Sequence, residues 1–422
     1  MHRLPTKQLT GLVLAVALLL AAPGSVQLLA QGGSNYSVFG VGDLYDHVSA
    51  VYEGLGGTSI AVPSPYALNS VNPAAVADLE TTRIQAAYSF RQIQANTDLR
   101  TVSQNNGKIQ GLTAGMSIDT ALGAGLLFGI RPFSTVNYRF QTTETDVYDD
   151  GETVSSSTEF RGSGGLTEFF MGGAIRPVDD LAVGINGVFY IGSINTATIT
   201  EYGSSLFSAA ETRRSFGFSG AGLRLGLAYD VTPRLRLGAT ATFNTDLDVD
   251  VENEYRSNSV TLYGDSTISS VDVSPMPSIL GFGASYTVGE FVWAADVLSK
   301  DFSSFSVRTG DGQAEFRRSN KVSAGVQWLR TTNAYQRYQD RWTWNFGLSY
   351  LQDYYQIRGT GLDEMAASIG VQIPVSERAM LDAALTVGQR GTMDDNLIQE
   401  RFFRLSFSLS MGDTWFKPFG QR

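Results

Sequence analysis

Residues able to act as nucleophiles, general bases or metal ligands are scarce in this 422-residue chain. It contains no cysteine and only two histidines, which excludes a thiolate nucleophile, a thiolate metal site and a disulfide framework. His2 lies in the N-terminal leader, and His47 has no apparent strand-borne partner for a Ser-His-Asp centre. A carboxylate-only cation site is conceivable in one acidic loop, at Asp146, Asp149, Asp150 and Glu152. The simpler interpretation of those acids is a solvated loop, so we expect no enzyme, no metal and no other cofactor.

Charge is sparse and acidic overall. Charged residues make up 17% of the chain and the formal net charge is −10, whereas about a quarter of a soluble domain is usually charged. The acidic balance argues against a nucleic-acid partner, because phosphate binding needs basic residues. The composition therefore gives little support for catalysis or metal binding at a discrete site. The strands and loops that carry the polar residues say more about function.

The N-terminus has the three regions of a secretory signal peptide. Arg3 and Lys7 precede an apolar run over residues 12–22, and Ala30 offers a small residue for cleavage. A single transmembrane anchor is the alternative, but the run is too short to span about 30 Å of hydrocarbon as a helix. We therefore expect residues 1–30 to be a signal peptide.

Alternation with a period of two dominates from Thr81 onward. In the last segment Phe403, Leu405 and Phe407 alternate with Arg404 and Ser406, so one face suits lipid and the other a wet lumen. This pattern predicts about fourteen strands, an even number as single-chain bacterial barrels require. The predicted strands are 81–93, 109–118, 121–141, 158–176, 180–199, 212–231, 234–250, 262–288, 290–307, 315–330, 341–357, 363–374, 379–390 and 401–416.

The connections between these strands fall into two sets. One set is tight, apart from the longer polar stretch 331–340. The other set is mostly longer and polar, at 94–108, 142–157, 200–211, 251–261, 308–314 and 391–400. Tight turns face the periplasm in outer-membrane barrels and longer loops face outward. The even strand count would place both chain ends in the periplasm.

The sequence thus predicts an all-β protein, a transmembrane antiparallel β-barrel over residues 81–416 in the lipid of the outer membrane, with a tail at 417–422. A soluble β-sandwich would also alternate, but its outward face would be charged. The C-terminal strand Phe403–Phe416 ends in aromatic residues. We expect the barrel-assembly machinery to recognise that strand.

Residues 31–80 lack alternation yet carry enough apolar side chains to pack, so we expect them to fold into the barrel lumen as a plug. Gly54, Gly56 and Gly57 permit close backbone packing and positive φ, although turn-making alone is an alternative role. Asn72 can cap a turn in which Pro73 takes the first helical position, followed by Ala74.

This segment resembles the N-terminal hatch of the FadL family. The stretch 54–61 reads GLGGTSIA, and Asn72-Pro73-Ala74 follows shortly before the first strand. The resemblance implies a fourteen-stranded barrel that takes up long-chain fatty acids or aromatic hydrocarbons, with ligand-triggered hatch movement and release through a lateral gap. One departure is that the helical outer loop region, which holds a ligand groove in that family, has no counterpart among these short to middling loops.

Several charged side chains are predicted to face the lumen. They are Arg83, Arg91, Arg224, Asp230, Arg236, Asp296, Lys321, Asp382 and Arg404. Of these, Arg83, Arg224 and Arg236 are candidates to clamp an acidic head group. The alternative is a solvated, mutually paired interior.

Prolines within strand-like stretches mark kinks, because proline removes a ladder hydrogen bond. Pro132 is one, and Pro275 with Pro277 is the pair that we expect to form a lateral gate. The alternative for each is a strand end outside the membrane.

The leading functional hypothesis is passive uptake of hydrophobic small molecules such as long-chain fatty acids. The alternatives are a barrel accessory of a protein secretion and surface-attachment system, and a structural barrel without cargo.

Overall fold

The computed structural model describes residues 33–46, 49–97, 101–147, 153–203, 207–257, 260–270, 274–307, 309, 314–330, 338–376, 378–394 and 397–415. The predicted signal peptide, His47, Asp149, Asp150, Glu152, Phe416 and the predicted tail lie outside these residues.

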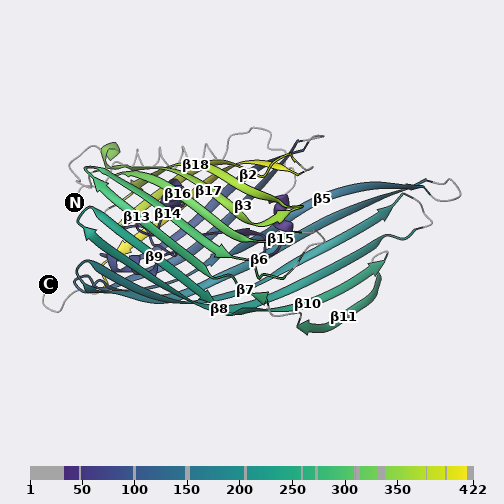
Figure 1. The fold of residues 1–422 in the computed structure, drawn as a ribbon, viewed down its shortest axis with the longest axis horizontal. Coiled ribbons are helices and arrows are strands. Elements are labelled where there is room, and N and C mark those ends of the chain that lie inside the picture. Colours follow the sequence, from purple (N-terminus) through teal and green to yellow (C-terminus); the bar gives the residue numbers. More distant parts are fainter. Residues whose placement is uncertain are drawn as a thin grey trace. The chain divides into compact units, whose positions relative to one another are not determined.

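The chain forms a closed antiparallel barrel of fourteen strands, so the predicted all-β barrel is confirmed (Figure 1). The first and last strands close it, with partners running from Thr82↔Asp413 to Asn96↔Gln399. The strand segments are β2 Thr82–Asn96, β3 Thr101–Asp119, β4 Ala124–Pro132, β5 Ser134–Val147, β6 Thr153–Val178, β7 Leu181–Tyr202, β8 Ala210–Thr232, β9 Leu235–Asn244, β10 Asp246–Ser257, β11 Val260–Ser270, β12 Ser274–Pro275, β13 Ile279–Val288, β14 Phe291–Asp301, β15 Glu315–Phe316, β16 Arg318–Trp328, β17 Thr343–Ile357, β18 Thr360–Pro374, β19 Ala379–Arg390 and β20 Gln399–Asp413.

The outer face of the barrel is apolar and the inner face polar. Phe282, Leu348 and Met365 are more than 60% exposed, whereas Asn345 and Ser408 are 1% exposed on the inner side. This is the alternation that a barrel in lipid requires, and it agrees with the outer-membrane location. Among the described helices, none has the length and apolar character needed to cross a bilayer.

Much of the sequence predicted as outer loop is strand. The β5–β6 hairpin continues to Val147 and resumes at Thr153, and β6 is 26 residues long. Strands β5 to β8 and β10 reach beyond their neighbours at one end (Figure 1). The alternation fades in these extensions because both faces meet water outside the membrane, which is why the pattern did not indicate strands there.

Three predicted strands are interrupted. The stretch 121–141 breaks at Phe133, 234–250 breaks at Thr245, and 262–288 is split into β11, β12 and β13. Phe133 is 1% exposed and lies inside the barrel. The break follows Pro132, which has no backbone N–H to give to a neighbouring strand.

The segment before the barrel fills the lumen. It contains η1 (Asn35–Val38), β1 (Asp43–Leu44), α2 (Ala50–Gly54) and η2 (Pro73–Asp78). Helix α2 contacts the wall at β17–β20, and η2 contacts β4 and β6–β8. The lumen is therefore occupied along much of its length.

The first described residues lie at the outer mouth, while the N-terminal end that we predict to be periplasmic is outside the described residues. Ser34 Oγ donates to Glu400 Oε2 (2.7 Å) and Tyr36 Oη to the Ile398 carbonyl (2.6 Å), at the barrel end opposite Thr82 and Asp413. Strand parity fixes where the ladder begins and ends, but not where the plug begins.

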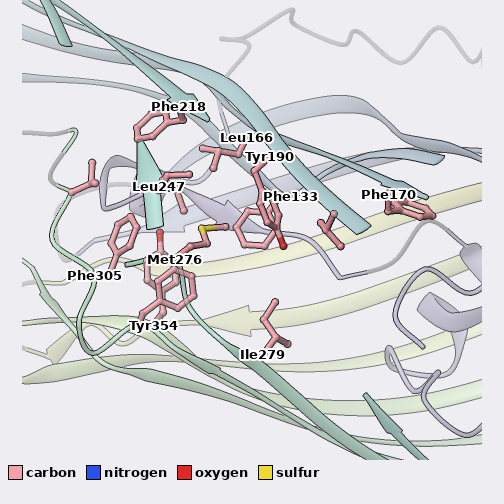
Figure 2. Packing of buried hydrophobic residues seen from close by; sticks show 14 of the residues in the cluster. Phe133, Leu166, Phe170, Tyr190, Phe218, Leu247, Met276, Ile279, Phe305 and Tyr354 are labelled. Carbon is pink, nitrogen blue, oxygen red and sulfur yellow. The ribbon is translucent and has the colours of Figure 1, made fainter. Parts of the chain in front are cut away.

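The predicted strand 290–307 ends earlier, because β14 stops at Asp301 and the chain turns into the barrel mouth. Phe302 and Phe305 are 0% and 5% exposed and join a large buried apolar cluster. Figure 2 shows Phe305, Tyr354 and Met276 within this cluster, together with Phe133 and Tyr190. The outer half of the barrel is thus packed with apolar side chains.

Candidate functional site

The barrel wall has a slot between β3 and β5. Strand β3 pairs with β4 only from Leu112↔Ile130 towards the periplasmic turn. Beyond that point, among the described residues, β3 pairs with β2 and β5 pairs with β6, but β3 and β5 do not pair with each other. The break at Phe133 therefore leaves two strand edges facing one another.

The hatch backbone pairs with part of the β5 edge that β3 leaves unpaired. Asp43 and Leu44 of β1 pair with Thr135 and Ser134, and the Gly33 amide donates to the Asn137 carbonyl (2.7 Å). Backbone groups that would otherwise lack a partner are thereby bonded. The plug is consequently also a piece of the wall.

The slot is a cleft of about 730 Å³. Its apolar lining includes Ile109, Leu112, Ile130 and Leu166, and its polar lining is Asn106, Lys108, Arg131, Ser134, Thr135, Asn137, Ser163, Thr167 and Ser193. The Lys108 ammonium also lies over the Tyr45 ring of the hatch, 4.7 Å from its centroid. Sequence reasoning missed Lys108, because alternation gives no sign of where the wall opens.

A second cavity of about 460 Å³, the outer pocket, lies on the inner face of the outer strand extensions. Phe140 and Phe160 stack in its wall with ring centroids 5.0 Å apart. The other lining residues are Val38, Phe39, Tyr138, Thr142, Glu144, Thr196, Thr198, Thr212, Arg214 and Thr309. Aromatic rings beside hydroxyl groups suit a mainly apolar ligand with a polar group.

Arg224 lies in the lumen, as predicted for a head-group contact, but its guanidinium is engaged. It donates to both carboxylate oxygens of Glu168 (3.0 and 2.9 Å) and to the Ser70 carbonyl of the hatch (2.8 Å). Arg131 donates to the same carboxylate (2.9 and 2.8 Å) and to the Asp46 carbonyl. Glu168 is 0% exposed, so two guanidiniums and one carboxylate tie the hatch to three strands.

Arg236 and Arg83 are also bonded within the protein. Arg236 holds both carboxylate oxygens of Asp78 in the hatch (2.7 and 3.1 Å). Arg83 donates to Ser410 Oγ (3.0 Å) and lies 5.2 Å from the centre of the Tyr66 ring. These contacts support the alternative of a paired interior, and head-group binding by the arginines stays a prediction.

The glycines of the hatch motif lie where the plug touches the wall. A Cβ at Gly54 would be 2.9 Å from the Gly370 Cα. Gly56 and Gly57 have φ of +69° and +90°, which side-chain-bearing residues rarely adopt. Both reasons for glycine therefore apply in the hatch motif: close contact with the wall at Gly54 and positive φ at Gly56 and Gly57.

Asn72, Pro73 and Ala74 begin η2. The Asn72 side chain accepts from the Ala74 amide (3.1 Å), and its Nδ2 donates to the carbonyls of Ile60 (2.8 Å) and Leu227 (3.1 Å). Asn72 thus caps the turn and joins two hatch segments to β8. Ala74 is 0% exposed, so the motif is a packed anchor.

The predicted gate prolines lie where the wall remains bridged. Pro275 pairs with Asp246 of β10, and the Asn244 side chain donates to the Pro277 carbonyl (2.7 Å). The slot follows Pro132 instead, so gating at Pro275 and Pro277 stays a prediction without a described opening beside it.

Acidic hatch residues missed by sequence reasoning face cations of the wall across a small chamber of about 90 Å³. Asp43 pairs with Arg390 (2.6 Å) and Arg91 (3.4 Å), and Glu53 pairs with Arg404 (3.1 Å). Burial alone would raise the pKa of Asp43, but Arg390 and Arg91 hold that pKa below its ordinary value. No group of three or more potential metal ligands occurs within the described ranges.

Comparisons with known proteins bear on the family and the fold. A family model described as BamG matches residues 11–419. A search of curated proteins found no match.

Solved structures with the same architecture include two hydrocarbon transporters and one FadL homologue. The toluene transporter TbuX of Ralstonia pickettii is 15% identical, with a TM-score of 0.55 over 87% of this chain and 98% of that one. The P. putida toluene transporter TodX is 12% identical, with a TM-score of 0.54 over 88% and 99%. A Pseudomonas aeruginosa FadL homologue is 12% identical, with a TM-score of 0.56 over 89% and 100%.

At these identities the structural likeness establishes the fold alone, whereas the family model spans nearly the whole sequence. The chain therefore belongs to the BamG family and folds as an outer-membrane barrel of the FadL type.

Proposed function

We propose that this barrel passively admits hydrophobic small molecules through the outer membrane, taking them up in the outer pocket and releasing them sideways through the slot. The observation that carries the proposal is the unpaired stretch between β3 and β5. An apolar solute that leaves through the wall enters lipid directly and does not cross the charged chamber beside the hatch.

The two cavities follow the same strand. Val136 lines the slot and Tyr138, two positions further along β5, lines the outer pocket. Their volumes of about 730 and 460 Å³ fall within the range usual for small-molecule sites, about 300 to 1,000 Å³. A ligand could therefore move along β5 from one to the other once the hatch residues between them shift.

The ligand could belong to either of two classes, monoaromatic hydrocarbons or long-chain fatty acids. Similar structures are described as toluene transporters and a monoaromatic hydrocarbon channel, and the sequence resemblance implies long-chain fatty acids. A fatty-acid carboxylate would have to displace Glu168 to reach Arg224, whereas the Lys108 ammonium already borders the slot. Lys108→Gln should therefore weaken binding of a fatty acid while leaving toluene unaffected.

The route is tested by filling each cavity with tryptophan and measuring ligand uptake into proteoliposomes. Thr142→Trp should block the outer pocket and Asn106→Trp the slot, each lowering uptake at least about tenfold, a barrier of about 1.4 kcal/mol. Thr143→Trp is the control for the first, because adjacent strand residues point to opposite faces. Val102→Trp, further along β3 and away from the slot, is the control for the second.

Uptake that survives both cavity-filling variants, with all four proteins correctly assembled, would show that the ligand does not follow this route. Absence of both binding and uptake in the unmodified protein would remove the transport proposal altogether.

A second candidate is an accessory role in assembling or exporting other outer-membrane proteins. The observation that favours it is membership of a family whose name, BamG, points to the barrel-assembly machinery. The plug bonded to several wall strands also suits a barrel that acts as a scaffold. Affinity purification from native membranes decides between the roles, because a scaffold should retain stoichiometric protein partners and its removal should reduce assembled barrels in the outer membrane.

A further inference from the structure

We propose that the inward-folded segment of residues 302–307 and 309, here named the latch, couples the outer pocket to the hatch. The inference rests on the proposed function, since it concerns how a ligand in that pocket would act. Connections at this end of a barrel ordinarily stand in water. In this one Phe302, Phe305 and Thr309 are 0%, 5% and 2% exposed.

The latch is packed firmly against the wall. The rings of Phe302 and Tyr354 are 4.3 Å apart and those of Phe305 and Phe316 are 5.2 Å apart, measured between centroids. Phe305 and Tyr354 both lie in the interior cluster (Figure 2). The aromatic contacts give the latch one defined position in the mouth.

The same latch holds one turn of the hatch. Thr309 Oγ1 donates to the Gly40 carbonyl (2.7 Å), while Tyr354 Oη shares its one proton between the carbonyls of Phe39 (2.9 Å) and Gly42 (2.8 Å). Gly40 has φ of +57°, and a Cβ there would lie 2.9 Å from the Tyr354 ring. The hatch turn is thus gripped both by the latch and by the ring on which the latch packs.

Thr309 also lines the outer pocket, beside Val38 and Phe39 of the hatch. A ligand in that pocket therefore touches Thr309, the donor of the Thr309–Gly40 hydrogen bond, and the hatch residues Val38 and Phe39 that directly precede Gly40. If it binds better when the Thr309 side chain has moved aside, its binding favours the released hatch turn. Occupancy of the pocket is in this way linked to the first step of hatch movement.

The test uses the full-length protein in detergent and hydrogen exchange of the amides in residues 39–42. Thr309→Val removes the hydroxyl but keeps the shape, and should raise exchange about threefold to tenfold, the effect of one hydrogen bond. Thr196→Val makes the same change at a β7 residue in the lining of the same pocket and should leave exchange unaltered. Toluene is the probe for occupancy and should raise exchange in the unmodified protein.

A disulfide can fix the latch, because the chain has no cysteine and the Ser274 and Ser306 hydroxyls are 3.4 Å apart. In oxidised Ser274→Cys/Ser306→Cys protein, toluene should no longer raise exchange, and reduction should restore the response. Equal exchange in the Thr309→Val and Thr196→Val proteins would overturn the latch, as would a persisting toluene response in the oxidised protein. If toluene does not bind, transport of toluene and its coupling to the hatch both fail, whereas faster exchange in Thr309→Val protein would still show that the latch holds the hatch turn.

Discussion

At the scale of single residues, the interior is held by a few shared carboxylates. Glu168 serves Arg131 and Arg224 at once. Glu168→Gln would leave two buried guanidiniums facing a neutral amide, which should destabilise the protein by about 3 to 5 kcal/mol. Glu159→Gln is the control, because its partners Arg139 and Arg161 are 58% and 47% exposed and such pairs contribute about 1 kcal/mol or less. Urea midpoints from heat-modifiable electrophoresis give both values, and similar losses would contradict the assignment.

Asp43 makes one end of the hatch sensitive to acid. Its folded-state pKa is lowered, despite burial, by Arg390 and Arg91. A carboxyl group with a depressed pKa contributes stability above its unfolded pKa of about 4 and loses it as the pH falls through the folded value. Limited proteolysis of residues 33–46 should therefore stay slow down to about pH 4 and accelerate below it. In Asp43→Asn protein the segment should already be loosened at neutral pH, and an unchanged acid response in that variant would exclude Asp43 as the cause.

At the scale of the element, two glycines with similar φ separate backbone strain from close packing. Gly56 has φ of +69° and a Cβ there would lie 2.7 Å from the Leu348 carbonyl oxygen, whereas Gly289 has φ of +61° with nothing within 4 Å. Gly289→Ala should cost only the left-handed conformation, about 1 to 2 kcal/mol. Gly56→Ala should cost clearly more, because the plug must also move off β17. Equal unfolding midpoints for the Gly56→Ala and Gly289→Ala proteins would mean that the hatch can move away from Leu348 without loss of stability.

The strands were predictable where one face met lipid and the other a polar lumen. Phe403, Leu405 and Phe407 alternate with polar residues in sequence, and β20 is formed there. The pattern could not show the break at Phe133, because apolar residues continue through it with unchanged spacing. Phe302 and Phe305 were assigned to a strand for the same reason, since a side chain buried in the mouth and one facing lipid are equally apolar.

The candidate site was less accessible to sequence reasoning than the fold. The Gly-rich stretch and Asn72 indicated a plug, and the buried contacts of Asn72 were within reach of that hypothesis. The pairing of Arg224 with Glu168 could not be predicted in this way, because Glu168 is 56 residues away and contacts Arg224 only after the strands have paired. The slot depends on an absent pairing between two strands, which no pattern within either strand records.

At the scale of the whole molecule, the wall strands close the barrel by pairing with one another, and the hatch backbone pairs with the wall at the edge of the slot. The ladder closes through β2 and β20 along fifteen residue pairs without help from the hatch. Among the described residues, the hatch backbone joins this edge through β1, the Gly33 amide and the Tyr45 amide, which donates to the Phe133 carbonyl (2.9 Å). The barrel should therefore assemble without the first part of the plug, while the slot should not stay closed.

Deleting residues 33–46 tests this separation. The deletion removes the strand that covers the edge of β5 and takes Asp43 and Asp46 from the cations of the wall. We expect a barrel that still shifts on heating in electrophoresis, but that conducts ions in planar bilayers where the full-length protein stays closed. Asp43→Asn, which keeps the segment, should give brief openings of the same conductance. A deletion variant that assembles and remains closed would show that the latch, rather than the hatch, seals the barrel.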